Sequence, residues 1–331
     1  MNDPVRFFRI VIVIFAVVLL LGFVILLLRY NPAIFNKSEE VETAKIGEVN
    51  YWKAPDSSKL TKDEIGNQIR YGRDLITRTS YYLGPHGTIA QISNGMNCQN
   101  CHLDAGTKPF GNNYGSVASL YPKFRERSGS IETIPKRIND CLQRSLNGSP
   151  LDSLSTEMKA IVSYITWLGK DVPKGEKARG SGFADIKWLD RPADSLAGRS
   201  LYLQKCLICH GLNGEGQKIS SDGNYVYPPL WGDHSFNTGA GLFRISNFSK
   251  YIRTNMPLGS TYKNPVLTEE EAWDIAAYVL SLPRPDKKFK KDWPKIETKP
   301  VDHPFGPYAD KFSEREHKYG PFKEMLEKIG K

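Results

Sequence analysis

Two copies of a five-residue motif, Cys-x-x-Cys-His, limit what this chain can fold into more than any other feature. The copies are CQNCH at residues 98–102 and CLICH at residues 206–210. Covalent attachment of haem c uses this spacing, because the two thiols form thioethers to the porphyrin and the adjoining histidine lies under the iron. A disulfide or a zinc site is the alternative, but neither needs a histidine after the second cysteine in both copies. The motifs predict two covalently bound haem c groups, attached to Cys98, Cys101, Cys206 and Cys209, with His102 and His210 as iron ligands.

The segments around both motifs follow one order: helix, haem motif, loops and closing helix. Capping signals and apolar periodicity predict helices after Thr61, around 135–146 and 156–168, and again around 195–204 and from Thr268 to Pro283. This order is typical of class I cytochromes c. We therefore expect an all-α fold with two class I cytochrome c-like domains in tandem.

The domain boundaries follow from composition. Residues 37–175 are expected to form the first domain, with the catalytic haem, and residues 176–331 the second, with the electron-transfer haem and a C-terminal extension. A segment rich in glycine and charge, 172–182, is expected to link them. The tail from about residue 286 is expected to wrap the surface without a core of its own.

The N-terminus carries an unbroken apolar run over residues 10–28. At about 1.5 Å per residue, this run could cross a hydrocarbon core of about 30 Å. A cleaved signal peptide would have a shorter apolar region and a small-x-small site. Residues 1–36 are therefore expected to be an uncleaved anchor with one transmembrane helix in the lipid bilayer. Because haem c is attached outside the cytoplasm, we expect an inner-membrane protein with a single-pass anchor and haem domains in the periplasm.

The formal net charge of +9 raises the question of a nucleic-acid partner. Lysines and arginines are interleaved with acidic residues along the chain, and no nucleic-acid-binding motif accompanies them. A solvated surface explains this charge, and no nucleic-acid partner is expected.

Each haem iron needs a second axial ligand. In the second domain, Met256 in TNMPLG stands where class I cytochromes c place a methionine ligand, and His234 is the rival. The first domain has no such methionine, since Met96 lies too close to its haem motif and Met158 is expected to be a core residue. His86 and Cys141 remain as possible ligands there.

Cys141 lies on the helix expected around residues 135–146. At about 100° per residue, Arg137, Cys141 and Ser145 form a stripe beside an apolar one. A lone cysteine is often a small buried hydrophobe. Arginines one turn away would instead lower the pKa of the thiol and favour the thiolate, which is both a nucleophile and a metal ligand. The pattern leaves both roles open.

At these residues the chain resembles the dihaem thiosulfate dehydrogenases, which couple two thiosulfates to tetrathionate. The stretch RINDCLQRSLNG is similar to the family's segment with the axial cysteine, and YPKFRERSG, the Met256 region and the tail HPFGPYADKFSEREHKYGPF are also similar. The resemblance covers roughly residues 60–331. It implies that His102 and Cys141 ligate haem 1, where the chemistry occurs, and that His210 and Met256 ligate haem 2. It also implies that Arg127 and Arg137 hold the anionic substrate, with Ser145 as a weaker candidate.

The resemblance predicts oxidative coupling of two thiosulfates to tetrathionate, or the reverse. Electrons would pass from haem 1 to haem 2 and on to an acceptor, either a cytochrome c or a membrane redox partner. Two features depart from the family: Asn255 stands where some members have an exchangeable lysine ligand, and a membrane anchor is not general. The main alternative is a membrane-tethered dihaem electron shuttle without substrate chemistry. A SoxA-like subunit is disfavoured, because the Met256 region belongs to an intact second cytochrome.

Overall fold

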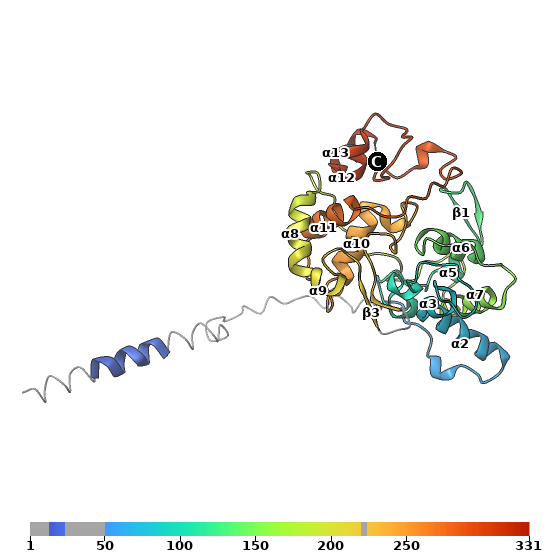
Figure 1. The fold of residues 1–331 in the computed structure, drawn as a ribbon, viewed down its shortest axis with the longest axis horizontal. Coiled ribbons are helices and arrows are strands. Elements are labelled where there is room, and N and C mark those ends of the chain that lie inside the picture. The colour runs from blue at the N-terminus through green and yellow to red at the C-terminus, as the bar shows by residue number, and fades with distance from the viewer. Residues whose placement is uncertain (1–12, 24–49, 220–223, 331) are drawn as a thin grey trace, which may run out of the picture. The chain divides into compact units, whose positions relative to one another are not determined.

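Helices dominate the computed structural model, which describes residues 13–23, 50–219 and 224–330 (Figure 1). In the first half of residues 51–331, the helices of four or more residues are α2 (Glu64–Thr77), α3 (Thr79–Leu83), α4 (Leu103–Gly106), α5 (Val117–Leu120), α6 (Ile134–Arg144) and α7 (Thr156–Leu168). In the second half they are α8 (Ser195–Lys205), α9 (Leu207–His210), α10 (Ile245–Asn255), α11 (Glu269–Ser281), α12 (Glu314–Tyr319) and α13 (Phe322–Lys328). The expectation of a mostly helical chain is confirmed.

Two short antiparallel hairpins are the departure from an all-α fold. Strand β1 (Lys123–Arg125) pairs with β2 (Ser130–Glu132), and β3 (Gln217–Ile219) pairs with β4 (Asn224–Tyr227). The first hairpin directly precedes α6, so its position bears on the site described below.

The expected transmembrane anchor is wrong for this structure. Residues 13–23 are helical, but none of the helices in the described ranges is long and apolar enough to span a bilayer. A crossing needs roughly 20 apolar residues, and this helix is clearly shorter. The rest of the apolar run 10–28, and of the expected anchor 1–36, lies outside the described residues. Residues 51–331 form a separate unit, and everything that follows concerns this unit.

Two pairs of packed helices organise this unit. Helix α2 packs on α7, and α8 packs on α11. In each pair a glycine allows close approach: a Cβ on Gly72 would lie 2.0 Å from the carbonyl oxygen of Ala160, and one on Gly198 would lie 1.8 Å from that of Asp274. No side chain fits at either position, so the backbones of α2 and α7, and those of α8 and α11, approach closely at these glycines.

Each half has its own apolar core. The first is built mainly from α2 and α7, with Leu75 and Ile161 almost fully buried. The second is built from α8, α10 and α11, with Trp273 at its centre. The C-terminal tail joins this second core through Phe322 and Met325, which are 2% and 1% exposed. The tail, expected to lie on the surface, is therefore an integral part of the second half.

The segment 172–182, expected to be a linker, packs against the first half. The backbone N–H of Phe110 donates to the carbonyl of Gly180 at 2.7 Å, and Ser116 donates to the hydroxyl of Ser181 at 2.6 Å. These contacts fix the loop that follows the first haem motif.

Candidate active site

Helix α6 carries Cys141, and its bounds have local causes. The hydroxyl of Thr133 accepts a hydrogen bond from the N–H of Lys136, and Pro135 occupies the first turn. Ser145 caps the C-terminal end, and Asn147 follows with a φ of 45°. The helix therefore places Arg137, Cys141 and Ser145 on one face.

The first haem motif presents a histidine prepared to bind metal. The Nδ1–H of His102 donates to the backbone carbonyl of Asn112 at 2.5 Å, and its ring stacks on Tyr114 with centroids 4.5 Å apart. Burial lowers the pKa of His102 to about 4. The imidazole is therefore neutral near pH 7, and its Nε2 keeps a lone pair for iron.

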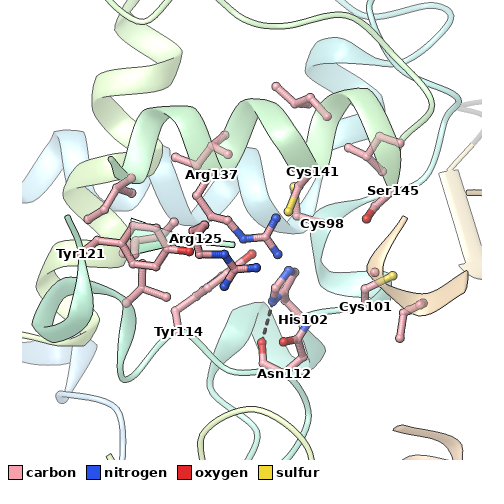
Figure 2. A pocket seen from close by; sticks show the side chains of 18 of the residues that line it. Cys98, Cys101, His102, Asn112, Tyr114, Tyr121, Arg125, Arg137, Cys141 and Ser145 are labelled. Carbon is pink, nitrogen blue, oxygen red and sulfur yellow. Dashed lines mark hydrogen bonds between the residues drawn. The ribbon is translucent and has the colours of Figure 1, made fainter. Parts of the chain in front are cut away.

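A cavity of about 540 Å³ lies between the first haem motif and α6 (Figure 2). Cys98, Cys101, His102 and Cys141 all line it, and Figure 2 shows His102 and Cys141 facing the same space from different elements. Apolar side chains form much of the wall: Ile76, Leu83, Val117, Ile134, Ile138, Leu142, Leu146, Ile161 and Ile165. Cofactor sites commonly measure roughly 300–1,000 Å³. Two free thiols, a neutral imidazole and apolar walls fit haem c, with Cys141 available as the second ligand.

The predicted substrate residues meet at this cavity. Arg127, Arg137 and Ser145 all line it. The negative charge of a Cys141 thiolate raises the pKa of Arg137, outweighing the effect of burial. Burial, with Arg144 and Arg137 as positive neighbours, lowers the pKa of Arg127 to about 10. Both guanidiniums remain cationic near pH 7, and they make this wall of the cavity attractive to anions.

The second haem motif also presents a buried histidine whose ring is oriented by a backbone carbonyl. The Nδ1–H of His210 donates to the carbonyl of Pro228 at 2.9 Å, and burial lowers the pKa of this histidine. Met256 caps the end of α10, and both it and Cys206 pack against the second core. A neutral imidazole, a thioether and two free thiols fit a haem with histidine and methionine ligands.

The rival ligands lie elsewhere. His86 and His234 are both exposed. Met158 is fully buried at 0% exposure, as expected for a core residue, and Met96 is buried in the second core. In contrast, Cys141 lines the cavity that contains His102, and Met256 is partly buried against the same core as Cys206, so ligation by these two residues stays a prediction that fits the structure.

Known protein families match both halves of the chain. The family described as SoxA/TsdA, cytochrome c domain, matches residues 89–173, and the cytochrome c family matches residues 195–283. The thiosulfate dehydrogenase of Psychrobacter arcticus is 42% identical over 73% of this chain and 71% of that protein. The thiosulfate dehydrogenase of Allochromatium vinosum is 36% identical over 70% of this chain and 83% of that protein. This chain belongs to the thiosulfate dehydrogenase family.

A solved structure agrees with this assignment. The thiosulfate dehydrogenase (TsdBA) from Marichromatium purpuratum, in its as-isolated form, matches with a TM-score of 0.66 and 30% identity. The match covers 76% of this chain and 52% of that chain, so this chain spans about half the length of that protein. The protein is therefore a thiosulfate-oxidising oxidoreductase with two cytochrome c domains and two covalently bound haem c groups.

The cavity of this thiosulfate dehydrogenase also includes residues that the sequence analysis missed. Arg125 and Tyr121 line it from the first hairpin and the segment before it, and Arg244 lines it from the second half. Trp293, in the C-terminal tail, lies with its ring 5.7 Å from the guanidinium carbon of Arg127. Arg125 is the last residue of β1 and Arg127 lies in the turn that follows, so no strand periodicity relates the two, and no local signal in the sequence marked Arg125.

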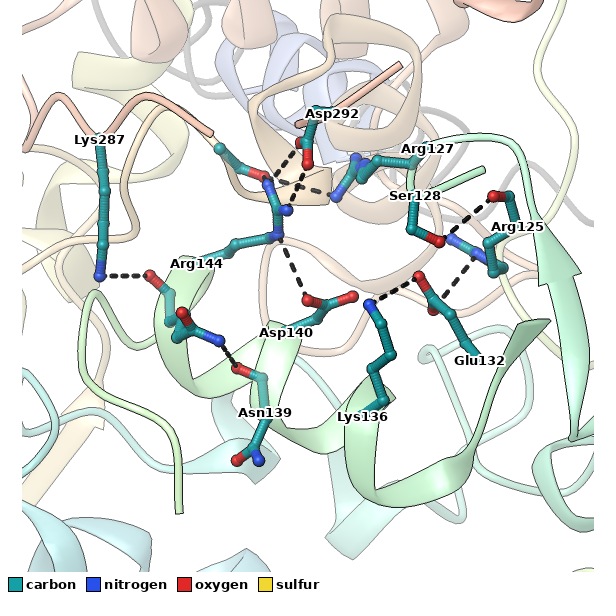
Figure 3. A network of polar contacts seen from close by, with 12 residues as sticks. Arg125, Arg127, Ser128, Glu132, Lys136, Asn139, Asp140, Arg144, Lys287 and Asp292 are labelled. Carbon is teal, nitrogen blue, oxygen red and sulfur yellow. Dashed lines mark hydrogen bonds and ion pairs between the residues drawn. The ribbon is translucent and has the colours of Figure 1, made fainter. Parts of the chain in front are cut away.

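A network of ion pairs lies beside the cavity (Figure 3). Asp292 of the tail accepts two hydrogen bonds of 2.7 Å from Arg144, and the same guanidinium stacks 3.7 Å from the ring centre of Phe289. Because Arg144 is the last residue of α6, this pair ties the tail to the helix that carries Cys141.

Proposed function

We propose that the protein couples two thiosulfate ions to tetrathionate, with Cys141 as the reacting thiol. One observation carries the proposal: Cys141 faces the same cavity as His102, with Arg137 beside it (Figure 2), and Arg127 lines this cavity too. An electron carrier has no need of a thiol and guanidiniums in its haem pocket. The chain belongs to a family of thiosulfate-oxidising enzymes, which argues against an electron shuttle that has no substrate of its own.

The first step forms a sulfur–sulfur bond. The thiolate of Cys141 and the terminal sulfur of one thiosulfate join as a cysteine S-thiosulfonate, with release of two electrons. Two ferric haem c groups, held at the motifs 98–102 and 206–210, would supply the oxidant for these two electrons. Arg127 and Arg137 hold the sulfonate group and offset the repulsion between the anions.

The second step follows the logic of thiol–disulfide exchange. A second thiosulfate attacks the sulfur that Cys141 has bound, tetrathionate forms, and the thiolate of Cys141 is released. Total charge is conserved: a thiosulfonate with one negative charge and a thiosulfate dianion give a thiolate and a tetrathionate dianion. Thiol–disulfide exchange and two-electron transfer are both reversible. The same site can therefore also reduce tetrathionate to thiosulfate.

The direction of electron flow follows from the ligands. As a ligand, a Cys141 thiolate would push electron density onto the iron held at the first motif, whereas Met256 would raise the potential of the haem at the second. The two haem groups would then offer electrons a path from the first motif to the second and on to a c-type cytochrome acceptor. Because the attachment of haem c takes place outside the cytoplasm, the proposal includes a periplasmic location for both haems.

The decisive experiment compares wild type, Cys141→Ala and Cys141→Met in the full-length holoprotein. Wild type should reduce ferricytochrome c when thiosulfate is added, and tetrathionate should appear in proportion. Both variants should lose the activity, because Cys141→Met retains a sulfur ligand but has no nucleophilic thiol. A Cys141→Met variant with wild-type turnover would refute the role of the thiol.

A further inference from the structure

Two guanidinium groups on the cavity, those of Arg127 and Arg137, make no ion pair within residues 50–219 and 224–330. Arg244 differs, because its guanidinium pairs with Asp302, which is fully buried. Arg125 has a side chain that is 35% exposed and makes one long ion contact, 4.0 Å from its Nε to Glu132, while its two terminal nitrogens make no hydrogen bond within the same residues. Guanidinium nitrogens on the cavity that have no partner in the protein can donate to a ligand there.

Tyr121 adds a neutral donor to this cluster. Its side chain is 9% exposed, and its hydroxyl makes no hydrogen bond to any other part of the described chain. Figure 2 shows this hydroxyl pointing toward the guanidiniums of Arg125 and Arg137. This hydroxyl opens into the cavity and is not enclosed by the protein, so it can donate a hydrogen bond to a ligand there.

A ligand that pairs with these guanidiniums and with the Tyr121 hydroxyl must be a hydrogen-bond acceptor. Guanidinium groups only donate hydrogen bonds, and a tyrosine hydroxyl next to them can complete the set as a third donor. An oxyanion satisfies all three groups at once. The cavity also contains Cys141, so an anion held here lies beside the reacting thiol.

We propose that Arg125 and Tyr121 bind a sulfonate group of the substrate, in addition to Arg127 and Arg137. The inference rests on the proposed function and extends its binding site. The Cys141 thiolate and the first thiosulfate dianion bring three negative charges together, and so do the thiosulfonate and the second thiosulfate. Arg127 and Arg137 offset two of these charges, and Arg125 supplies a third positive charge on the same cavity.

The test uses Arg125→Gln and Tyr121→Phe in the full-length holoprotein, with Lys159→Gln as the control. Lys159 is an exposed residue of α7 and does not line the cavity, so its replacement removes one positive charge without changing the site. The KM for thiosulfate should rise about tenfold in Arg125→Gln and roughly fivefold in Tyr121→Phe. In Lys159→Gln it should stay within about twofold.

A second measurement does not depend on turnover. Sulfate, an unreactive oxyanion, should bind by calorimetry to the ferric protein, and its dissociation constant should rise in parallel with KM. Loss of sulfate affinity in Arg125→Gln supports the subsite even if the wild type makes no tetrathionate, which would overturn only the proposed function. Unchanged sulfate affinity and unchanged KM would overturn the subsite alone.

Haem propionates are the other anions that could meet this cluster. If Arg125 and Tyr121 held a propionate, the variants would lose haem or change the midpoint potential of haem 1 while KM stayed the same. That result would also overturn the inference. Two haems per chain, an unchanged potential and a raised KM are the expected outcome.

Discussion

The pair formed by Asp302 and Arg244 allows a sharp prediction about stability. Asp302 lies in the tail, its side chain is 0% exposed, and it accepts hydrogen bonds from Arg244 Nε at 2.9 Å and Nη2 at 2.5 Å. It also accepts from the backbone and the hydroxyl of Ser246 at 3.1 and 2.5 Å. Asp302→Asn keeps the shape of the side chain but places an NH₂ group where donors already point. It also leaves the Arg244 charge without its partner.

The expected loss is large for a single substitution. Breaking a buried ion pair from one side costs about 3–5 kcal/mol. With about 2.1 cal/mol/K of unfolding entropy per residue, the loss should lower the Tm of this 331-residue protein by roughly 4–7 °C. The difference should also depend on pH. Burial alone would raise the pKa of Asp302, but the charge and hydrogen bonds of Arg244 and Ser246 outweigh it and lower the pKa. A carboxyl with a lowered folded pKa stabilises fully above its unfolded pKa of about 4 and loses this effect as pH falls through the folded pKa.

Urea unfolding of wild type and Asp302→Asn, followed by circular dichroism at several pH values, measures this difference. It should be constant from pH 7 to about pH 5 and shrink below about pH 4. The control is Asp190→Asn, which removes another ion pair to the tail, with Lys323 at 2.6 Å. Asp190 is 81% exposed, so its variant should unfold like wild type. A loss below about 1 kcal/mol in Asp302→Asn would refute the reasoning.

Three further substitutions test other parts of the structure. Met256→His should lower the midpoint potential of haem 2 by on the order of 0.1 V in a redox titration, and an unchanged potential would contradict ligation by Met256. Asp292→Asn should lower the free energy of unfolding by about 2–3 kcal/mol, because Arg144 would lose both of its 2.7 Å hydrogen bonds to a carboxylate. Gly198→Ala should cost about 1–3 kcal/mol in thermal unfolding, since its Cβ would meet the Asp274 carbonyl, and a neutral effect would show that α8 can shift.

Locally determined features could be predicted from the sequence. The haem motifs needed only their own spacing, and the helix expected over 156–168 has those bounds in the structure. The capping box of Thr268 and Glu271 is present, with each side chain bonded to the other's backbone. At the start of α2 the same pattern failed, because the carboxylate of Asp63 accepts from Gly66 N at 2.8 Å and takes the capping position expected for Thr61. An aspartate inside the box was the stronger cap.

The rest of the site depends on contacts between distant parts of the chain. Arg144 and Asp292 are 148 positions apart, and nothing in the local pattern of either residue indicates the other. Arg125 was not predicted because the sequence analysis placed no hairpin before α6. The strand and turn of this hairpin bring Arg125 and Arg127 to one cavity, which the spacing of the two residues alone does not indicate.

The same contacts explain how the tail affects the charge of the cavity. Among the arginines in or beside it, the tail neutralises Arg144 through Asp292 and Arg244 through Asp302. The guanidiniums of Arg127 and Arg137 stay without a carboxylate within the described residues. The two tail carboxylates therefore leave the uncompensated positive charge on arginines that line the cavity, among them Arg137, which lies one helical turn from Cys141. An anion is attracted to these arginines, so the tail contributes to where thiosulfate binds as well as to stability.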